Sequence, residues 1–377
     1  MAIRAEPLPF DEATAATTDA STLRRGALWM LIAAKMLAGW GVQWDIQWHV
    51  LIGRDSFWIP PHVMTYAGVS ILVLVSFGVL AWETLRGEGP VRVLGLRGSR
   101  GFHLAAWGIA ITVLAAPIDD LWHRLYGIDV TLWSPPHLLG LVGSVVNTLG
   151  CFVIIREIYP PASRMRLVAT LLAGTFLYGN LHLMVDPSIR IAYLYGGVRF
   201  YTLAILSALL LPLALVGTAR LSARRWAPVA LLVVAIVVGM IGQRIAREGF
   251  EILRPVSVID AEIAKDPTSP IAVATTMARK EGRIPGRTGG LLHLYALAPA
   301  LAMTLVDARR RPVAATLAYA LTLFAVLGWL LTGRPTLAPM APDLGATTIA
   351  LLLTVAAGLV SGAGARWLSD SLARSSG

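Results

Sequence analysis

The sequence is poor in charge and in cysteine, and each shortage excludes a class of protein. Only 14% of its 377 residues are Asp, Glu, Lys or Arg, while 56% are hydrophobic. An average soluble domain carries about 25% charged residues, so a water-soluble globular protein is excluded. The single cysteine, Cys151, provides neither a disulfide framework nor a thiolate cluster. Any bound metal must therefore rest on nitrogen and oxygen ligands.

Long apolar stretches dominate the chain. About ten windows are long enough to cross a hydrocarbon core of about 30 Å. They predict an all-α fold, a polytopic transmembrane helical bundle, because only helices and closed barrels satisfy the backbone in lipid. The lipid bilayer is thus an expected partner. The predicted spans are 26–47, 60–83, 103–122, 135–157, 164–184, 199–221, 226–245, 287–306, 312–331 and 345–367.

The net charge of +10 comes largely from arginines in the short connections between these windows. In a soluble protein such charge would suggest nucleic acid, but here it follows the positive-inside pattern, so no nucleic-acid partner is expected. The pattern predicts a cytoplasmic N-terminus and an integral protein of a bacterial inner membrane. The arginines that define it are Arg86, Arg92, Arg97, Arg100, Arg156, Arg164, Arg166, Arg220, Arg224, Arg225, Arg309, Arg310 and Arg311.

Composition divides the chain into five segments. Residues 1–23 are polar and rich in Ala and Thr, and we predict a disordered cytoplasmic tail. Residues 24–160 hold two metal-binding transmembrane hairpins, described below, and 161–245 are further transmembrane helices. The proline-containing segment 246–286 is expected on the extracytoplasmic side as a loop or small cap. Residues 287–377 form the C-terminal transmembrane helices.

One motif occurs twice in the first half of the chain. From Asp45 the chain reads DIQWHVLIGRDSFWIPPH, and from Asp119 it reads DDLWHRLYGIDVTLWSPPH, with one extra residue in the second copy. An internal repeat of this kind predicts two helical hairpins related by a pseudo-two-fold axis. In each hairpin the motif covers the outer turn.

The spacing within each copy suits a metal site. Asp45 and His49 are four residues apart, which places them on one face of a helix. Pro60 and Pro61 suit the first turn of the next helix and bring His62 to its start. A carboxylate and two imidazoles can hold copper, iron or zinc and leave positions open for a reactant. The predicted metal ligands are Asp45, His49 and His62 at the first site and Asp119, His123 and His137 at the second.

The other polar residues near these motifs are assigned supporting roles. An ionised Asp near the bilayer centre costs about 2.5–3.5 kcal/mol, and a bound cation offsets that cost. We predict that Asp55, Asp129 and His182 act in catalysis, where they would orient ligand imidazoles or move protons. The alternative interpretation is that all these side chains are interfacial residues, held by water and by hydrogen bonds at helix ends.

Two features of the first span are predicted to be structural. Trp40, Trp44 and Trp48 form a stripe at steps of four residues, which is typical of an aromatic belt at the membrane interface. Lys35 is expected to snorkel to the interface or to pair with an acid.

The run from Asp45 to His62 resembles the metal motif of the C subunit of the copper membrane monooxygenases, the particulate methane and ammonia monooxygenases. In that family an aspartate, a histidine four residues later and a histidine thirteen residues further on bind copper within the membrane. The family's recurring Trp-His pair, Arg-Asp pair and proline also have counterparts here, namely Trp48-His49, Arg54-Asp55 and Pro61.

The family's second site has the spacing of Asp119, His123 and His137, but an asparagine replaces the aspartate. The resemblance covers roughly residues 30–160. It implies a copper-dependent membrane monooxygenase, or a subunit of one, that activates dioxygen and hydroxylates a small apolar or lipid-like substrate. It also implies other membrane-enzyme subunits as partners, and a homo-oligomer is the alternative assembly.

Two other functions fit the same residues. Repeats and intramembrane carboxylates are typical of transporters, so a metal- or proton-coupled membrane transporter or a metal-handling protein is the alternative. A membrane scaffold with a structural metal is the third hypothesis. Iron and zinc stay open as alternatives to copper, since two histidines and one carboxylate are also the usual ligand set of non-haem iron.

Overall fold

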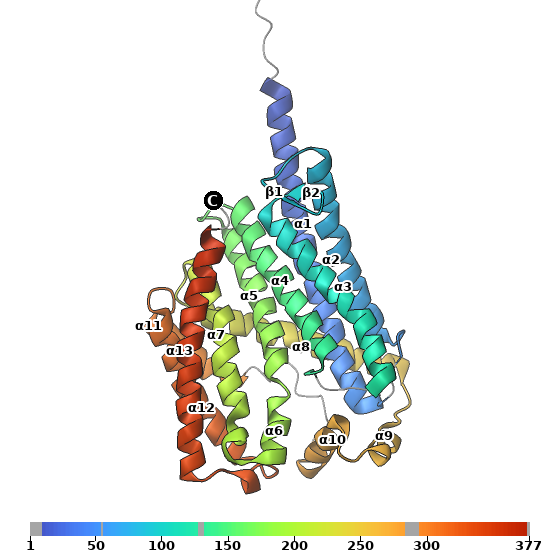
Figure 1. The fold of residues 1–377 in the computed structure, drawn as a ribbon, viewed down its shortest axis with the longest axis vertical. Helices are drawn as coiled ribbons and strands as arrows, with labels where there is room; N and C mark the ends of the chain where they lie inside the picture. Colours follow the sequence, from blue (N-terminus) through green and yellow to red (C-terminus); the bar gives the residue numbers. More distant parts are fainter. Residues whose placement is uncertain (1–9, 54–55, 127–131, 283–293, 375–377) are drawn as a thin grey trace, which may run out of the picture.

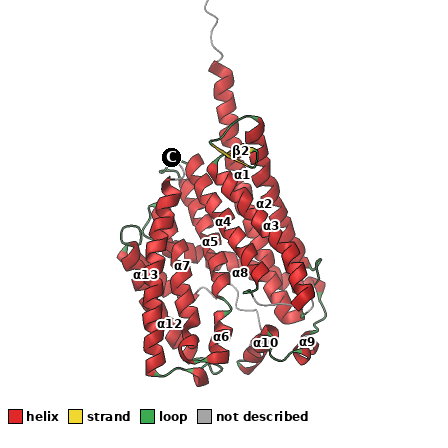
Figure 2. Cartoon of the chain, in the orientation of Figure 1, coloured by secondary structure: helices red, strands yellow, loops and turns green. Residues whose placement is uncertain are grey.

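The computed structural model describes residues 10–53, 56–126, 132–282 and 294–374, without the side chains of residues 10–20, His123 and Pro270. Helices make up most of this part of the chain and stand side by side in one bundle (Figures 1 and 2). The predicted all-α helical bundle is therefore confirmed. The first half contains α1 (Phe10–Ile52), α2 (Pro60–Leu85), β1 (Val91–Val93), β2 (Leu96–Gly98), α3 (Arg100–Tyr126), α4 (Pro135–Ile158), α5 (Arg164–Val185) and α6 (Ser188–Tyr195).

The second half of the chain is also helical. It contains η1 (Gly197–Tyr201), α7 (Thr202–Ser222), α8 (Ala227–Leu253), α9 (Ile259–Lys265), α10 (Pro270–Lys280), α11 (Leu297–Val306), α12 (Pro312–Thr332), η3 (Ala338–Met340) and α13 (Leu344–Arg374). The short antiparallel hairpin of β1 and β2, in which Val91 pairs with Gly98, is the exception to the helical pattern.

Eight helices among the described residues are long and apolar enough to cross a membrane. They are α2, α3, α4, α5 with α6, η1 with α7, α8, α12 and α13. The predicted span 26–47 lies inside α1, and the end of the predicted span 287–306 coincides with the shorter apolar helix α11. Neither belongs to the eight, so the count of about ten spans stays a prediction.

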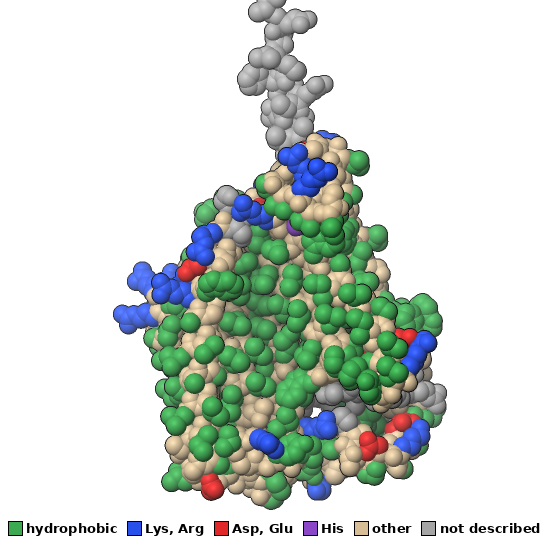
Figure 3. All heavy atoms as spheres, in the orientation of Figure 1, with side chains coloured by type: hydrophobic (Ala, Val, Ile, Leu, Met, Phe, Trp, Pro, Cys, Tyr) green, Lys and Arg blue, Asp and Glu red, His purple; other side chains and the backbone are tan. Residues whose placement is uncertain are grey.

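The outer surface of the bundle is apolar, as a membrane protein requires. Leu74, Leu305 and Trp329 are 71%, 77% and 74% exposed, and hydrophobic side chains cover the broad middle of the face in Figure 3. A soluble monomer rarely exposes large contiguous apolar patches. These exposed apolar side chains are suited to contact with the hydrocarbon chains of a lipid bilayer.

Glycine lets the two helices of each N-terminal hairpin pack closely against each other. A Cβ atom on Gly68 of α2 would lie 2.7 Å from the backbone nitrogen of Ala38 in α1. A Cβ atom on Gly143 of α4 would lie 2.6 Å from the nitrogen of Thr112 in α3. Small residues are the usual means of close helix contact in membranes. The similar packing of α1 with α2 and of α3 with α4 accords with the predicted hairpins, while their symmetry stays a prediction.

Two predicted segment boundaries differ from the observed elements. Helix α1 begins at Phe10 and so includes most of the predicted tail over 1–23. Helix α8 continues to Leu253, beyond the predicted end at residue 245. The rest of the segment 246–286 contains the short helices α9 and α10, which lie beyond the end of α1 (Figure 1).

A buried carboxylate fixes the opposite end of the bundle. Glu83 is 0% exposed and accepts a hydrogen bond of 2.7 Å from Nε of Arg24. Its other oxygen accepts a 2.9 Å bond from the backbone N–H of Ser99, just before α3. Glu88 contacts the same arginine at 3.4 Å but is partly exposed. This network ties the β1–β2 hairpin and the start of α3 to α1.

Candidate metal centre

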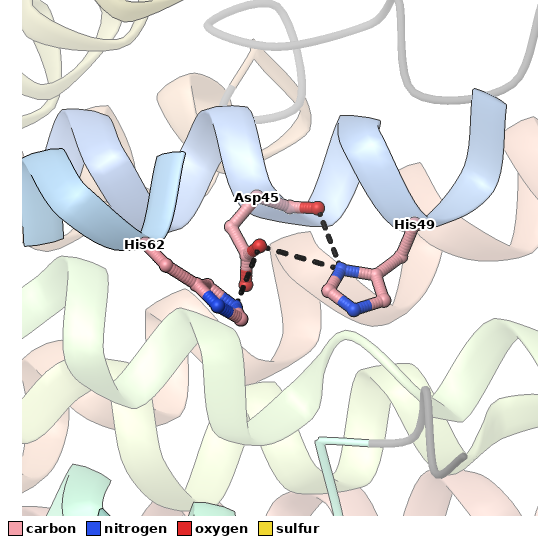
Figure 4. Close-up of side chains that lie close together, drawn as sticks. All are labelled: Asp45, His49 and His62. Carbon is pink, nitrogen blue, oxygen red and sulfur yellow. Dashed lines mark hydrogen bonds and ion pairs between the residues drawn. The ribbon is translucent and has the colours of Figure 1, made fainter. Parts of the chain in front are cut away.

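The three predicted ligands of the first site meet at the turn between α1 and α2. Asp45 and His49 lie on the last turns of α1, one helical turn apart, and His62 lies in the first turn of α2. Pro60 and Pro61 occupy the first positions of α2, as the sequence predicts. Figure 4 shows the carboxylate of Asp45 between the two imidazole rings. We call Asp45, His49 and His62 the first cluster.

The distances within the first cluster suit one shared ion. Oδ1 of Asp45 lies 3.2 Å from Nε2 of His62 and 3.4 Å from Nδ1 of His49. One ligand atom from each residue can be chosen so that all three lie within 4.8 Å of one another. Two ligands about 2.0–2.2 Å from a metal, at tetrahedral or right angles, are about 3–3.5 Å apart. The Asp45–His62 pair therefore has the spacing of two ligands of one metal ion, and a ring nitrogen of His49 lies close enough to complete the set.

Hydrogen bonds orient both imidazoles. Nδ1 of His62 lies 3.0 Å from the carbonyl oxygen of Ser56, and when it donates its proton there, Nε2 carries the lone pair that faces Asp45. Nδ1 of His49 lies 2.9 Å from the carbonyl oxygen of Asp45, and when it donates its proton there, Nε2 is the ring nitrogen of His49 left for a metal. Metal-binding histidines usually donate their other ring N–H to a carbonyl or carboxylate, which fixes the tautomer.

The first cluster is partly shielded from solvent. The side chains of Asp45, His49 and His62 are 24%, 17% and 20% exposed. Oδ1 of Asp45 is itself buried and makes no hydrogen bond of good geometry among the described residues. A buried anionic oxygen in this state is stabilised by a cation, which again fits a metal at this place.

The second predicted set is visible only in part. Oδ1 of Asp119, near the end of α3, lies 3.4 Å from Nε2 of His137 in the first turn of α4. This contact corresponds to that of Asp45 with His62. The side chain of His123 lies outside the described part of the structure, so the second set of ligands stays a prediction.

The three predicted catalytic residues are not part of the first cluster as it is described. Asp55 and Asp129 lie outside the described residues. His182, on α5, is 7% exposed and has Tyr178 and Tyr295 as ring neighbours. The roles of all three in catalysis stay predictions.

The tryptophan stripe has a different place from the one predicted. Trp44 and Trp48 are 8% and 6% exposed, and the ring of Trp48 stacks on Phe250 of α8 at 5.8 Å. They form a buried cluster between α1 and α8 instead of an exposed interface belt. The sequence could not show this, because Phe250 is distant along the chain. This packing of Trp44 and Trp48 supports the helix turns of α1 that carry Asp45 and His49.

Lys35 is also placed differently. Its side chain is 6% exposed, and Nζ donates a 2.9 Å hydrogen bond to Oγ1 of Thr148 in α4. Among the described residues no carboxylate forms a salt bridge with it. It neither snorkels nor pairs with an acid there, because α1 turns this position toward α4.

Comparison with known proteins gives no relative. No family model matches the sequence, no curated protein matches it, and no solved structure matches the fold. Fold and site together define the class, an α-helical membrane protein with a candidate Asp-His-His metal centre. A more specific function must be argued from the chemical properties of these residues.

Proposed function

We propose that the protein is a copper-dependent integral-membrane monooxygenase, or a subunit of one, that activates dioxygen and hydroxylates a small apolar or lipid-like substrate. The observation that carries this proposal is the convergence of Asp45, His49 and His62 at one turn of a membrane-type bundle. Two imidazoles and one carboxylate leave coordination positions open, as an oxygenase needs.

Copper is the preferred metal for this site. It binds nitrogen and oxygen ligands more tightly than the other divalent first-row ions, and the resemblance of the motif points the same way. A bound copper ion would supply the redox chemistry with dioxygen. The protein's own residues would hold the metal and orient its ligands. Asp45 supplies negative charge, and the Ser56 carbonyl keeps the His62 ring in place. Iron and zinc are the alternatives.

Apolar side chains beside the first cluster favour an apolar substrate. The rings of His62 and Tyr66 are 5.7 Å apart, and the ring of Phe57 lies 4.9 Å from that of Tyr66. Phe57 and Trp58 are 59% and 73% exposed. A small apolar molecule that partitions from the bilayer would meet these side chains before it reached the imidazoles.

The proposal extends to location and partners. The arginine-rich connections favour a cytoplasmic N-terminus in a bacterial inner membrane. The first cluster then lies at the extracytoplasmic end of the bundle. Other membrane-enzyme subunits, or further copies of this chain, would bring electrons to the site.

Metal analysis combined with oxygen uptake tests the proposal. We expect the full-length protein, purified in lipid nanodiscs, to retain copper and to consume dioxygen when a small alkane or alkene and a reductant are present. His49→Ala should lower both the copper content and the oxygen uptake. His103→Gln is the matched control, since His103 is buried beside the Val91 carbonyl and far along α3 from the predicted ligands.

Two outcomes would overturn the proposal. Copper retained at full content in His49→Ala would contradict the ligand assignment. Metal movement across the membrane of reconstituted vesicles, without substrate-dependent oxygen uptake, would indicate the transporter alternative.

A further inference from the structure

A second polar group lies in the other half of the bundle, where α7 packs against both α5 and α12, and α11 packs against α12. Tyr178 and His182 come from α5, Ser207 from α7 and Tyr319 from α12. Tyr295 lies directly before α11. We call these five residues the tyrosine cluster. None of them belongs to the first cluster.

The rings of the tyrosine cluster are close to one another. The ring centroid of His182 lies 6.0 Å from that of Tyr178 and 6.1 Å from that of Tyr295, each pair tilted by 36°. Tyr295 is close enough to interact electrostatically with Tyr178 and Tyr319. It is also close enough to interact with the carboxylate of Asp186, the C-cap residue of α5.

The hydroxyl groups of this cluster are buried in an apolar helical core, although the side chain of Tyr295 is partly exposed. Tyr178, Ser207 and Tyr319 are 0% exposed. The hydroxyl of Tyr319 has no hydrogen-bond partner among the described residues. The hydroxyls of Ser207 and Tyr295 face each other, yet neither makes a hydrogen bond of good geometry within that part of the chain.

Several buried hydroxyls in one place are costly unless something hydrogen-bonds to them. In hydrocarbon no bulk water is present to form hydrogen bonds with an unsatisfied polar group. Polar internal sites in proteins are typically satisfied by ordered water, which makes two to four hydrogen bonds to groups of this kind. Hydroxyls, which both donate and accept, can pass a proton along such a chain, and imidazole and carboxylate can take it up.

We propose that the tyrosine cluster holds ordered water molecules that link Tyr319 and Ser207, through Tyr295 and His182, to Asp186 at the helix end. Through this chain the His182 imidazole exchanges protons with the solvent at the end of the bundle where α5 ends. The inference does not depend on a metal or on the proposed oxygenase function.

Water contact can be tested directly by hydroxyl-radical labelling. Short X-ray exposure of the full-length protein in nanodiscs generates radicals from bound water, and mass spectrometry measures which side chains are oxidised. We expect Tyr319, which is 0% exposed, to be labelled several-fold faster than Tyr201. Tyr201 is the matched control, since it is 5% exposed and stacks on Phe324 at 4.5 Å. Labelling of Tyr319 at the rate of Tyr201 would overturn the proposal.

A tyrosine variant tests the same site through stability. Tyr319→Phe should lower the thermal unfolding midpoint if the hydroxyl binds water, because a hydrogen bond is lost. A raised midpoint would show that the hydroxyl is dry, since removal of an unsatisfied buried group relieves a penalty.

Proton exchange at His182 is the third readout. In protein with isotope-labelled histidine, the ring N–H signal assigned through His182→Gln should disappear as soon as the nanodiscs are transferred to heavy water. A signal that persists after the transfer would overturn the exchange path.

Discussion

Asp45 and His62 meet across the turn that joins α1 to α2, with Oδ1 of the aspartate 3.2 Å from Nε2 of the histidine. The corresponding atoms of Asp119 and His137 are 3.4 Å apart across the turn between α3 and α4. Each contact joins the last turns of one helix to the first turn of the next. The two contacts accord with the repeat in the sequence, while the second metal site stays a prediction.

Each of these sites should lose its metal independently. We expect His62→Ala and His137→Ala each to remove one of two metal equivalents, and the double variant to remove both. Loss of a ligand should weaken binding by at least about ten-fold, since even the loss of a group that only orients a ligand has that effect. Metal content per protein, measured by mass spectrometry, checks this. Equal metal content in wild type and the double variant would refute both sites.

The buried Glu83 should matter more to stability than the neighbouring Glu88. Glu83→Gln leaves Arg24 and the Ser99 N–H without a charged acceptor, and we expect a loss of about 3 kcal/mol. Glu88→Gln is the control, because Glu88 is 34% exposed and lies at 3.4 Å from the same arginine. Its loss should stay below about 1 kcal/mol. The unfolding midpoints of the two variants in detergent test this prediction. Equal shifts for Glu83→Gln and Glu88→Gln would contradict the greater role of Glu83.

Gly53 should be sensitive to substitution because of its backbone. Its φ is +71°, and an added Cβ would lie 3.1 Å from Cα of Ile259 at the start of α9. We expect Gly53→Ala to destabilise by about 1 kcal/mol or more. Gly78→Ala in α2 is the matched control. Nothing lies within 4 Å of its added Cβ, and alanine favours the helix by up to about 1 kcal/mol. A neutral effect at Gly53 would mean that the turn adapts.

Lys35 offers a test with the opposite sign. Its buried ammonium has only a neutral hydrogen-bond partner of known position, Oγ1 of Thr148. Lys35→Met keeps the volume and removes the buried charge, so the protein should become more stable by about 1 kcal/mol. Thr148→Val, which removes the acceptor and keeps the lysine, should destabilise it. A destabilised Lys35→Met would indicate that the charge has a partner of its own.

Local sequence patterns predicted several features of the site correctly. The spacing of Asp45 and His49 placed both on one helix face, and Pro60 with Pro61 marked the start of α2. These features depend on helix geometry and on the missing N–H of proline, which act within one or two turns. The place of Trp48 in an interface belt was wrongly predicted, because its burial depends on contact with Phe250 of α8.

Composition by itself determined that this chain is a helical membrane protein, because a backbone in hydrocarbon must satisfy its hydrogen bonds internally and so many apolar residues suit no other solvent. The tertiary structure alone decided which polar groups from distant helices meet. Lys35 turns to Thr148, and Tyr319 lies near Tyr295. Such contacts depend on how helices far apart in the sequence are rotated and shifted against each other. The spacing of hydrophobic residues along one helix does not determine that arrangement.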